Sequence, residues 1–441
     1  MISKDAGNEN EFSFRWNTVP FYSTFIAIIL GVYLLPNVFP SYIGTGYVSL
    51  TLAMSCLSVL AWHYDIMSPR NVLLLSILGC LCLAPLVPYT SNDTQRYLWD
   101  GAVFLSGLDP YVISPNDPLA ANLREIWATP EEHAKYATLY PPGGLFLFSI
   151  CSLAGPDYAI WIWKLMTTSA VIISLITVFK LLVSRNLTRH FYLIAFSPLL
   201  LFESQIGGHL DIFSVLGVVL ALWALEKDKV VLAGIIIGLA ATTKFLPAVI
   251  VGPFLFHLHP RKAFKLFASS ALTWLSLYAV IFGLGYKPLG LLPTFFEKWR
   301  GGAPFFPILE EVKLFLGLSN HYFLMGLIGL AVTGFSVSAW LAHKGSIVTA
   351  IMLSLSIPLL LSPVLFPWYL LVLVPLLALR PSVTVFLAIT FAPLSYVALD
   401  KWLAQGIWDQ PSWPPIVLGV VIMIGLGADM FNNHRSISGL K

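Results

Sequence analysis

The segment YAIWIWKLMTTSAVIISLITVFKLLV, residues 158–183, decides the fold class of this chain. It is almost wholly apolar, and it is longer than the roughly 20 residues with which an α-helix crosses the ~30 Å hydrocarbon core of a membrane. Similar runs recur along the whole chain. We expect spans at about 20–39, 45–63, 71–88, 158–183, 190–206, 209–225, 230–243, 246–258, 264–285, 321–342, 346–362, 368–379, 382–399 and 414–430. The sequence therefore predicts an all-α polytopic membrane protein with about 12–14 transmembrane helices.

Composition supports this class and excludes others. Of the 441 residues, 57% are hydrophobic and 11% are charged, whereas a soluble domain carries about 25% charged residues. The mean hydropathy is +0.81. The net charge of +3 is small and spread out, which predicts no nucleic-acid partner. The four cysteines have neither zinc-site spacing nor the pattern of a disulfide framework, so we expect them to serve packing rather than metal or redox chemistry.

The short loops predict the orientation, because lysine and arginine accumulate in short cytoplasmic loops. With the N-terminus in the cytoplasm, nearly all short-loop positive charges fall inside, and Lys244 and Lys401 are the exceptions. This holds only if GGLFLFSICSLA, residues 143–154, does not cross the membrane. The run is short for a span, so we expect a helix on the outer face; a short true span is the alternative.

The predicted topology leaves two large outer loops, 89–157 and 286–320. Residues 1–70 form an N-terminal tail with two additional helices, residues 71–431 the main transmembrane domain, and residues 432–441 a cytoplasmic tail. No glycine-rich phosphate loop of the P-loop type is present in the sequence, which argues against bound ATP or a nucleotide sugar on the cytoplasmic side. No internal repeat is evident either, which argues against a transporter built from repeats.

The first outer loop opens with SNDTQRYLWDG, residues 91–101. Asp93 lies about five residues beyond an apolar run, where a lipid head group would sit, and its carboxylate is a candidate general base. Capping of the next helix is the alternative role. Asp100 follows seven residues later on the same helical face, where it could bind sugar hydroxyls, orient Arg96 or be solvated.

Later spans add polar residues at the same side. ESQIGGHLD, residues 203–211, brings His209 and Asp211 next to a glycine pair, which would allow close approach of a ligand or form a tight capped hairpin. Lys244 lies in the break between two short helices. An unpaired ammonium there is costly, so it requires a protein carboxylate or a phosphate, and we favour the phosphate.

The second outer loop contains Lys298 and Arg300, which could clamp a phosphate or form a solvated face. Trp368 and Tyr369 lie at a span end, where an interfacial aromatic belt is the first interpretation and sugar or lipid contact the second. Charged and aromatic residues thus gather on the outer side only. This asymmetry indicates chemistry on a lipid-linked phosphate at the outer leaflet.

An ordered set of residues carries a resemblance to a known family. The order is Asp93, Tyr97, Asp100-Gly101, Gly107, Pro110-Tyr111 and Tyr140-Pro141-Pro142, followed by GGHLD at 207–211, Lys244 and FPWYL at 366–370. Over residues 71–399 it resembles GT-C glycosyltransferases. It is closest to polyprenyl-phosphate-mannose-dependent mannosyltransferases, including bacterial α-1,6-mannosyltransferases and the first mannosyltransferase of GPI-anchor synthesis.

The resemblance implies an inverting enzyme that moves a sugar, expected to be mannose, from a polyprenyl phosphate to a lipid-linked or glycan acceptor on the extracytoplasmic side. It implies that Asp93 is the general base. Many members carry an Asp-x-Asp pair at this position, whereas this chain has Ser91-Asn92-Asp93. We therefore expect a single base, no metal and no cofactor.

The remaining site residues follow from the same hypothesis. We expect the departing phosphate to be held by Lys244, Arg300, His209 and Arg96. We expect the sugar and the acceptor to contact Asp100, Tyr97, Tyr111, Tyr140, Asp211, Trp368 and Tyr369. The predicted partners are the lipid-linked donor, the acceptor and membrane lipids, and the predicted location is a bacterial inner membrane.

Two other functions remain open at this point. Broken helices and charged residues within the membrane would suit a transporter or flippase of lipid-linked saccharides, although alternating access requires polar groups on both sides. A ligase or polymerase of lipid-linked glycans would share the outer-face chemistry. Such an enzyme would usually have its large outer loop late in the chain, whereas here the large loop comes early.

Overall fold

The computed structural model describes residues 8–438, and the side chains of residues 18–432 apart from His133. The predicted cytoplasmic tail includes Arg435 and Lys441, which lie outside the residues whose side chains are described. The start of the predicted N-terminal tail lies outside the described residues as well.

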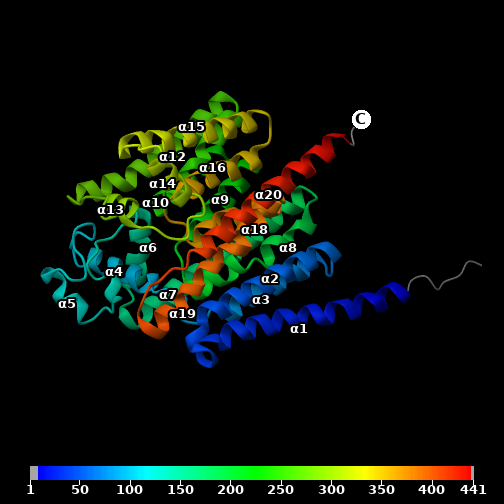
Figure 1. The fold of residues 1–441 in the computed structure, drawn as a ribbon, viewed down its shortest axis with the longest axis horizontal. Coiled ribbons are helices and arrows are strands. Elements are labelled where there is room, and N and C mark those ends of the chain that lie inside the picture. Colours follow the sequence, from blue (N-terminus) through cyan, green and yellow to red (C-terminus); the bar gives the residue numbers. More distant parts are fainter. Residues whose placement is uncertain (1–7, 439–441) are drawn as a thin grey trace, which may run out of the picture.

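The described residues form helices and one isolated bridge between Gly301 and Val364. Figure 1 shows their arrangement. The α-helices are α1 Asn8–Val38, α2 Ile43–Tyr64, α3 Pro69–Leu83, α4 Asp93–Leu105, α5 Ala121–Arg124, α6 Pro142–Ser152, α7 Pro156–Ser184, α8 Tyr192–Ala195, α9 Asp211–Glu226, α10 Val230–Thr243, α11 Val251–His257, α12 Pro260–Gly283, α13 Leu292–Lys298, α14 Phe306–Phe315, α15 Asn320–His343, α16 Ile347–Leu361, α17 Val374–Leu379, α18 Val383–Phe391, α19 Val397–Gln405 and α20 Trp413–Ser438. Shorter 3-10 segments are η1 Pro40–Tyr42, η2 Pro118–Ala120, η3 Glu131–His133, η4 Thr188–Phe191, η6 Leu246–Ile250, η7 Pro367–Leu373 and η8 Ala392–Tyr396, and η5 Leu199–Gly207 is a π-helix.

The all-α polytopic prediction is confirmed. Within the described residues, seven helical segments are long and apolar enough to cross a membrane, and several shorter apolar helices accompany them. The quoted segment forms most of α7, whose 29 residues begin at Pro156 after a left-handed glycine, Gly155. Proline at the first turn is favourable because its missing N–H has no intrahelical partner there.

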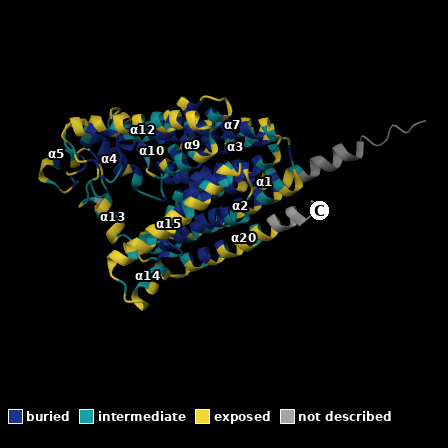
Figure 2. Ribbon diagram, turned by 90° about the horizontal axis from the view of Figure 1, so that it is seen from above, coloured by how far each residue is buried: buried dark blue, intermediate teal, exposed yellow. Residues whose placement is uncertain are grey.

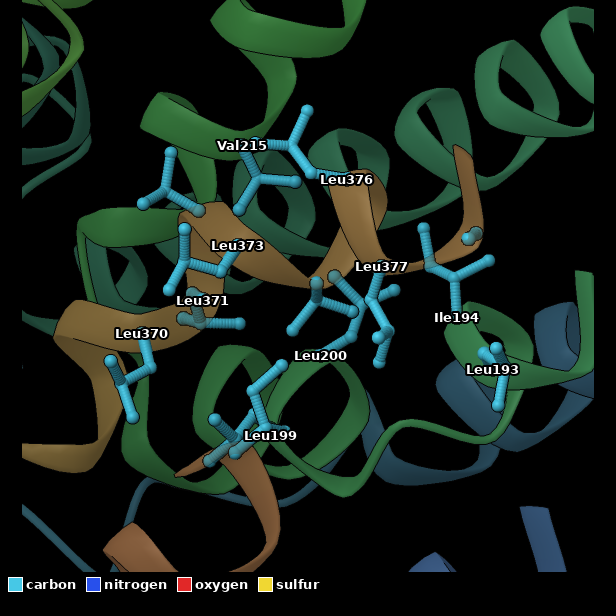
Figure 3. Close-up of a cluster of buried hydrophobic side chains, with 14 of the residues drawn as sticks. Leu193, Ile194, Leu199, Leu200, Val215, Leu370, Leu371, Leu373, Leu376 and Leu377 are labelled. Atoms are coloured by element: carbon cyan, nitrogen blue, oxygen red, sulfur yellow. The ribbon is translucent and has the colours of Figure 1, made fainter. Parts of the chain in front are cut away.

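Side chains buried at the centre join several helices into one core. Figure 3 shows leucines of η5, η7 and α17 meeting residues of α8 and α9. By contrast, α12 and α15 carry large exposed apolar side chains, such as Leu272 and Leu324, along their outer faces (Figure 2). An apolar surface of this kind suits contact with lipid chains, which offer no hydrogen bonds.

The predicted single span at 190–206 is broken into η4, α8 and η5. Pro198 causes the break, because it has no N–H to continue the helix of the preceding turn. The chain resumes as a nine-residue π-helix, in which Glu203 is the central residue. π-helical segments occur often at functional sites.

The two long loops meet at one end of the molecule, where α4, α5, α6 and α13 lie together (Figure 1). Helix α6 has 11 residues and packs against α4, α7 and α10. The loops are joined directly, since the Leu291 N–H donates to the carbonyl oxygen of Thr138 at 3.1 Å. They enclose the site described next.

Candidate active site

A cavity of about 1440 Å³ lies where the two long loops, 89–157 and 286–320, meet the ends of the core helices. Its walls come from the start of α4, the segment 131–140, α13, η7, and the segment from Ser395 to Gln410 that contains α19. Seven of the twelve predicted site residues line it: Asp93, Arg96, Tyr140, Lys244, Arg300, Trp368 and Tyr369. The other five lie behind its wall: Tyr97, Asp100, Tyr111, His209 and Asp211.

Asp93 is the first residue of α4, and Asn92 occupies the N-cap position. The Asp93 carboxylate is 20% exposed and faces the cavity. Its Oδ2 atom lies 3.3 Å from Nδ1 of His209 and accepts a hydrogen bond from the Tyr97 hydroxyl at 3.4 Å. A carboxylate held on one side by protein and open on the other can accept a proton from a bound molecule.

His209 lies in the turn between η5 and α9, outside the helices, and its ring is fully buried. One ring nitrogen lies 3.3 Å from Asp93 and the other 3.3 Å from Glu203. Burial favours the neutral imidazole, but the two carboxylates outweigh it and raise the pKa of His209 to about 9. The imidazolium is also stacked on Trp368, with 3.8 Å between ring centroids.

Glu203 is a fully buried carboxylate in the π-helix η5. Its Oε1 accepts a hydrogen bond from the Tyr47 hydroxyl at 2.6 Å, and its Oε2 accepts one from the Tyr396 hydroxyl at 2.7 Å. Glu203 begins the motif at 203–211, but the sequence predicted no role for it. The available signal was a carboxylate inside an apolar run, which membrane proteins retain mainly for function.

The glycine pair before His209 is required by this packing. Gly208 has φ of +67°, a conformation that glycine adopts at no steric cost. A side chain at Gly207 would come within 2.6 Å of the His209 ring. The predicted close approach therefore occurs, but in this structure the approaching groups are the protein's own imidazole and carboxylate.

Lys244 follows α10 at the predicted break, and its ammonium is 2.9 Å from the Asp211 carboxylate. It also lies 4.6 Å from the centroid of the Tyr369 ring. Of the two anions considered from the sequence, the structure thus contains the protein carboxylate. Contact with a phosphate stays a prediction, since Lys244 also lines the cavity.

Arg96 and Asp100 form a buried ion pair one helical turn apart, with Nε 2.9 Å from Oδ1. Asp100 is 1% exposed, so it orients Arg96 and is not solvated. The Arg96 Nη1 donates to the carbonyl oxygen of Tyr136 at 2.7 Å, which ties α4 to the loop segment on the opposite cavity wall. The other proposed role of Asp100, binding a sugar, stays a prediction.

Arg300 lines the cavity from the second long loop, 286–320. Its side chain is 43% exposed and its Nε lies 3.1 Å from Glu310. The adjacent Gly301 exchanges backbone hydrogen bonds with Pro363 and Leu365, which fixes the loop against the segment before η7. Lys298 of α13 lines the same cavity and is exposed.

The predicted aromatic residues divide into two groups. Trp368, Tyr369 and Tyr140 lie on the cavity wall. Tyr97 is instead stacked in parallel on Phe148, with 4.6 Å between centroids, and only its hydroxyl reaches Asp93. Burial raises the pKa of Tyr97 well above its ordinary value, so this hydroxyl stays protonated and acts as a donor.

Tyr111 belongs to a small separate core with Leu145 and Ile281. It is 4% exposed. In the structure Tyr111 packs within this core and does not line the cavity. Among the described residues, no group of three or more histidine, cysteine, aspartate and glutamate side chains is arranged to hold a metal ion. The predicted independence from metals and cofactors stays a prediction.

Comparison with known proteins gives a family match for the middle of the chain. Residues 138–306 match the sequence model of Glycosyltransferase family 87. No curated protein matches the chain. The family match indicates a glycosyltransferase. The matched region includes His209, Lys244 and Arg300, whereas Asp93 precedes it.

Proposed function

We propose that this glycosyltransferase is an inverting enzyme that transfers a sugar from a polyprenyl phosphate to an acceptor hydroxyl, with Asp93 as the general base. One observation carries the proposal. The Asp93 carboxylate is held by the buried His209 and opens onto a cavity whose lining includes the cationic side chains of Arg96, Lys244 and Arg300. A proton acceptor next to cations is what attack by a hydroxyl and departure of a phosphate require.

The proposed reaction is a single displacement, in which one bond forms at the anomeric carbon and one breaks. The acceptor oxygen attacks the anomeric carbon from the face opposite the phosphate, and its proton passes to Oδ2 or Oδ1 of Asp93. The bond between the anomeric carbon and the phosphate oxygen breaks, and its electron pair leaves with the polyprenyl phosphate. Attack from the opposite face inverts the configuration at this carbon.

Lys244 and Arg300 stabilise the negative charge that develops on the departing phosphate. An ammonium has three donors, and Asp211 and the Tyr369 ring occupy only part of the Lys244 environment. Arg300 is partly exposed, so its guanidinium can turn toward a ligand. His209 is buried behind the wall, and we propose that it holds Asp93 in place of contacting the phosphate.

The cavity offers two further environments for the substrates. The segment with Leu399, Trp402 and Leu403 is apolar and suits the polyprenyl chain of the donor. The outer end is lined by Glu131, Glu132 and other polar side chains, with Trp299 beside them, and suits sugar hydroxyls. We propose mannose as the sugar on the basis of the GT-C resemblance, with a bacterial inner membrane as the location and the site on the extracytoplasmic side.

The test uses the full chain reconstituted with a series of radiolabelled polyprenyl-phosphate sugars and a lipid acceptor extract. The Asp93→Asn variant should lose about 10²- to 10⁴-fold in kcat, because no group accepts the proton. Asp157→Asn, the same change at an exposed residue of α7, should retain native activity. Label transfer that survives Asp93→Asn at the native rate would refute the base assignment.

The same experiment distinguishes the other functions. A native protein that transfers no label from any of these donors would contradict the proposed donor class. Movement of an intact lipid-linked saccharide across the reconstituted bilayer, without transfer, would then favour a flippase. Transfer of a whole oligosaccharide from a lipid diphosphate would favour a ligase or polymerase.

A further inference from the structure

Helix α7 carries a lysine in the apolar core, at Lys164, that the proposed reaction does not use. Lys164 is only 2% exposed, and it does not line the cavity. It lies in the segment whose apolar character predicted a membrane span. A cationic side chain in such a place is costly and is retained mainly where it has a function.

The side-chain hydrogen bonds of Lys164 lead to the π-helix η5. Its ammonium donates to the backbone carbonyl oxygen of Gln205, and also to the side-chain Oε1 of Gln205 at 3.1 Å. The Thr168 hydroxyl, one turn later on α7, donates to the same Oε1 at 3.1 Å. Among the described side chains, no carboxylate forms an ion pair with Lys164. Its role is therefore hydrogen bonding to neutral oxygens of one segment.

The neighbouring residue on α7 holds the end of the same segment. The indole Nε1 of Trp163 donates to the carbonyl oxygen of Gly208 at 2.8 Å, and the Trp163 side chain is fully buried. Two adjacent residues of one long helix thus bind carbonyl groups on either side of the turn that leads into His209. Carbonyl groups at the end of a helix need such partners, since the helix itself leaves them unsatisfied.

This turn sets the geometry of the base. His209 follows Gly208 directly, and its ring nitrogens lie 3.3 Å from Asp93 and 3.3 Å from Glu203. A displacement of the turn by 1 Å would break both contacts, and misplacement on that scale can lower a rate by about 10²-fold. The link from α7 to Asp93 passes through the turn and needs no contact with substrate.

We propose that Lys164 and Trp163 are positioning residues, which hold the end of η5 so that His209 braces Asp93 for proton transfer. The inference rests on the proposed function. It adds two residues whose side chains touch neither donor nor acceptor, and it gives a reason for a buried ammonium without a counter-ion.

The first test is Lys164→Met, assayed in the reconstituted full-length enzyme. We expect kcat to fall about 10- to 100-fold, with KM for the donor changed less than about twofold, because Lys164 does not line the cavity. Thr177→Val is the matched control. Thr177 is a buried residue of the same helix whose hydroxyl binds only its own helix, at the carbonyl oxygen of Ile173, so this variant should keep native kcat.

A double-mutant cycle separates positioning from general damage to the fold. Lys164→Met acts through His209, so in the His209→Ala background it should cause little further loss of kcat. Independent, additive losses would overturn the inference. Trp163→Phe, which removes the hydrogen bond to Gly208 and keeps an aromatic ring, should give the same split between kcat and KM and serves as the second variant if Lys164→Met does not fold.

The outcomes for this inference and for the proposed function are distinct. A native enzyme without transfer from any polyprenyl-phosphate sugar contradicts the proposed function. A native enzyme that transfers, with kcat unchanged in both Lys164→Met and Trp163→Phe or with only KM altered, contradicts the positioning role alone. Thermal unfolding of each purified variant checks that the compared proteins are folded.

Discussion

Asp93 has a mixed environment that suits a base. An imidazolium and a tyrosine hydroxyl approach its Oδ2 atom, and the cavity lies on its open side. The positive charge of His209 is also neutralised by the buried carboxylate of Glu203, to which two tyrosine hydroxyls donate hydrogen bonds. A buried charge is tolerated when its partners are complete, and removal of any one partner leaves the others costly.

The charge on His209 predicts how stability depends on pH. The folded-state pKa of about 9 lies above the ordinary value, so the stabilising contribution is full below about pH 6.5 and is lost as the pH rises through about 9. His209→Asn, which cannot be protonated, should unfold at a lower temperature than the native protein at pH 6. The difference in Tm, measured in detergent, should narrow toward pH 10. A difference that stays constant or widens over this range would contradict the charged state.

At the scale of elements, η5 is the feature that joins the site to the core. Pro198 ends the preceding helical segment, and the nine-residue π-helix then brings Glu203 inward. The glycine pair that follows turns the chain so that His209 lies against Trp368. A regular helix over residues 190–206 would have pointed these side chains in other directions, because residues project every 100° around a helix with 3.6 residues per turn.

A substitution at Gly208 tests the importance of the turn between η5 and α9. In Gly208→Ala, the new methyl group would lie 2.5 Å from Oγ1 of Thr94, next to Asp93, in a residue with φ of +67°. We expect a lower Tm and a kcat that is lower by at least about 10-fold. The reason is that backbone strain and the clash together displace the first turn of α4.

Gly285→Ala is the matched control for Gly208→Ala. Gly285 has φ of +80° and nothing within 4 Å of the added carbon, so it reports backbone strain alone. It should lower Tm modestly, by an amount that corresponds to about 1–3 kcal/mol, and leave kcat unchanged. Equal effects of the two substitutions on kcat would show that the contact with Thr94 is unimportant.

At the scale of the whole molecule, the site is assembled from segments that are distant in the sequence. Glu203 accepts hydrogen bonds from Tyr47 of α2 and Tyr396 of η8, which lie 156 and 193 residues away in the sequence. Helix α2 belongs to the first 70 residues, which the sequence suggested were an addition to the main domain, yet its Tyr47 contributes to the charge network. The region that matches the glycosyltransferase family covers only the middle of this assembly.

The contribution of α2 can be measured with Tyr47→Phe. Loss of the hydroxyl removes one donor from a buried carboxylate, which costs about 1.5–3 kcal/mol of stability. We expect a lower Tm and a several-fold lower kcat. Tyr33→Phe, at a residue that is 41% exposed on α1, should change neither. Native kcat in Tyr47→Phe would confine the catalytic machinery to the later helices.

The proposed sidedness predicts a labelling pattern. In a variant with its four cysteines replaced, Leu119→Cys lies in the first outer loop at a residue that is 70% exposed. An impermeant maleimide should label it in intact cells. Lys227→Cys, in an exposed short loop between α9 and α10, should be labelled only after permeabilisation. The reverse pattern would put the cavity on the cytoplasmic side and contradict the proposed donor chemistry.

The site could be predicted from sequence only as a set of residue types at one end of the helices. Apolar runs identified the helices, and α10 begins and ends at the predicted residues, Val230 and Thr243. Lys244 was predicted to need an anion, but the choice of Asp211 depended on how α9 and α10 pack. Lys164 was missed, since one lysine within the quoted segment does not interrupt its apolar character.

The amino-acid sequence by itself determined the fold class and the grouping of polar residues, because these depend on local hydrophobicity over a window of residues. Only the tertiary structure decided that Asp93, His209 and Glu203 meet, that Tyr111 packs away from the cavity and that Lys164 binds the end of η5. The physical reason is that such contacts join side chains on different helices. They depend on the rotation of each helix about its axis and on the π-helical turn, and neither is encoded in the pattern of any single segment.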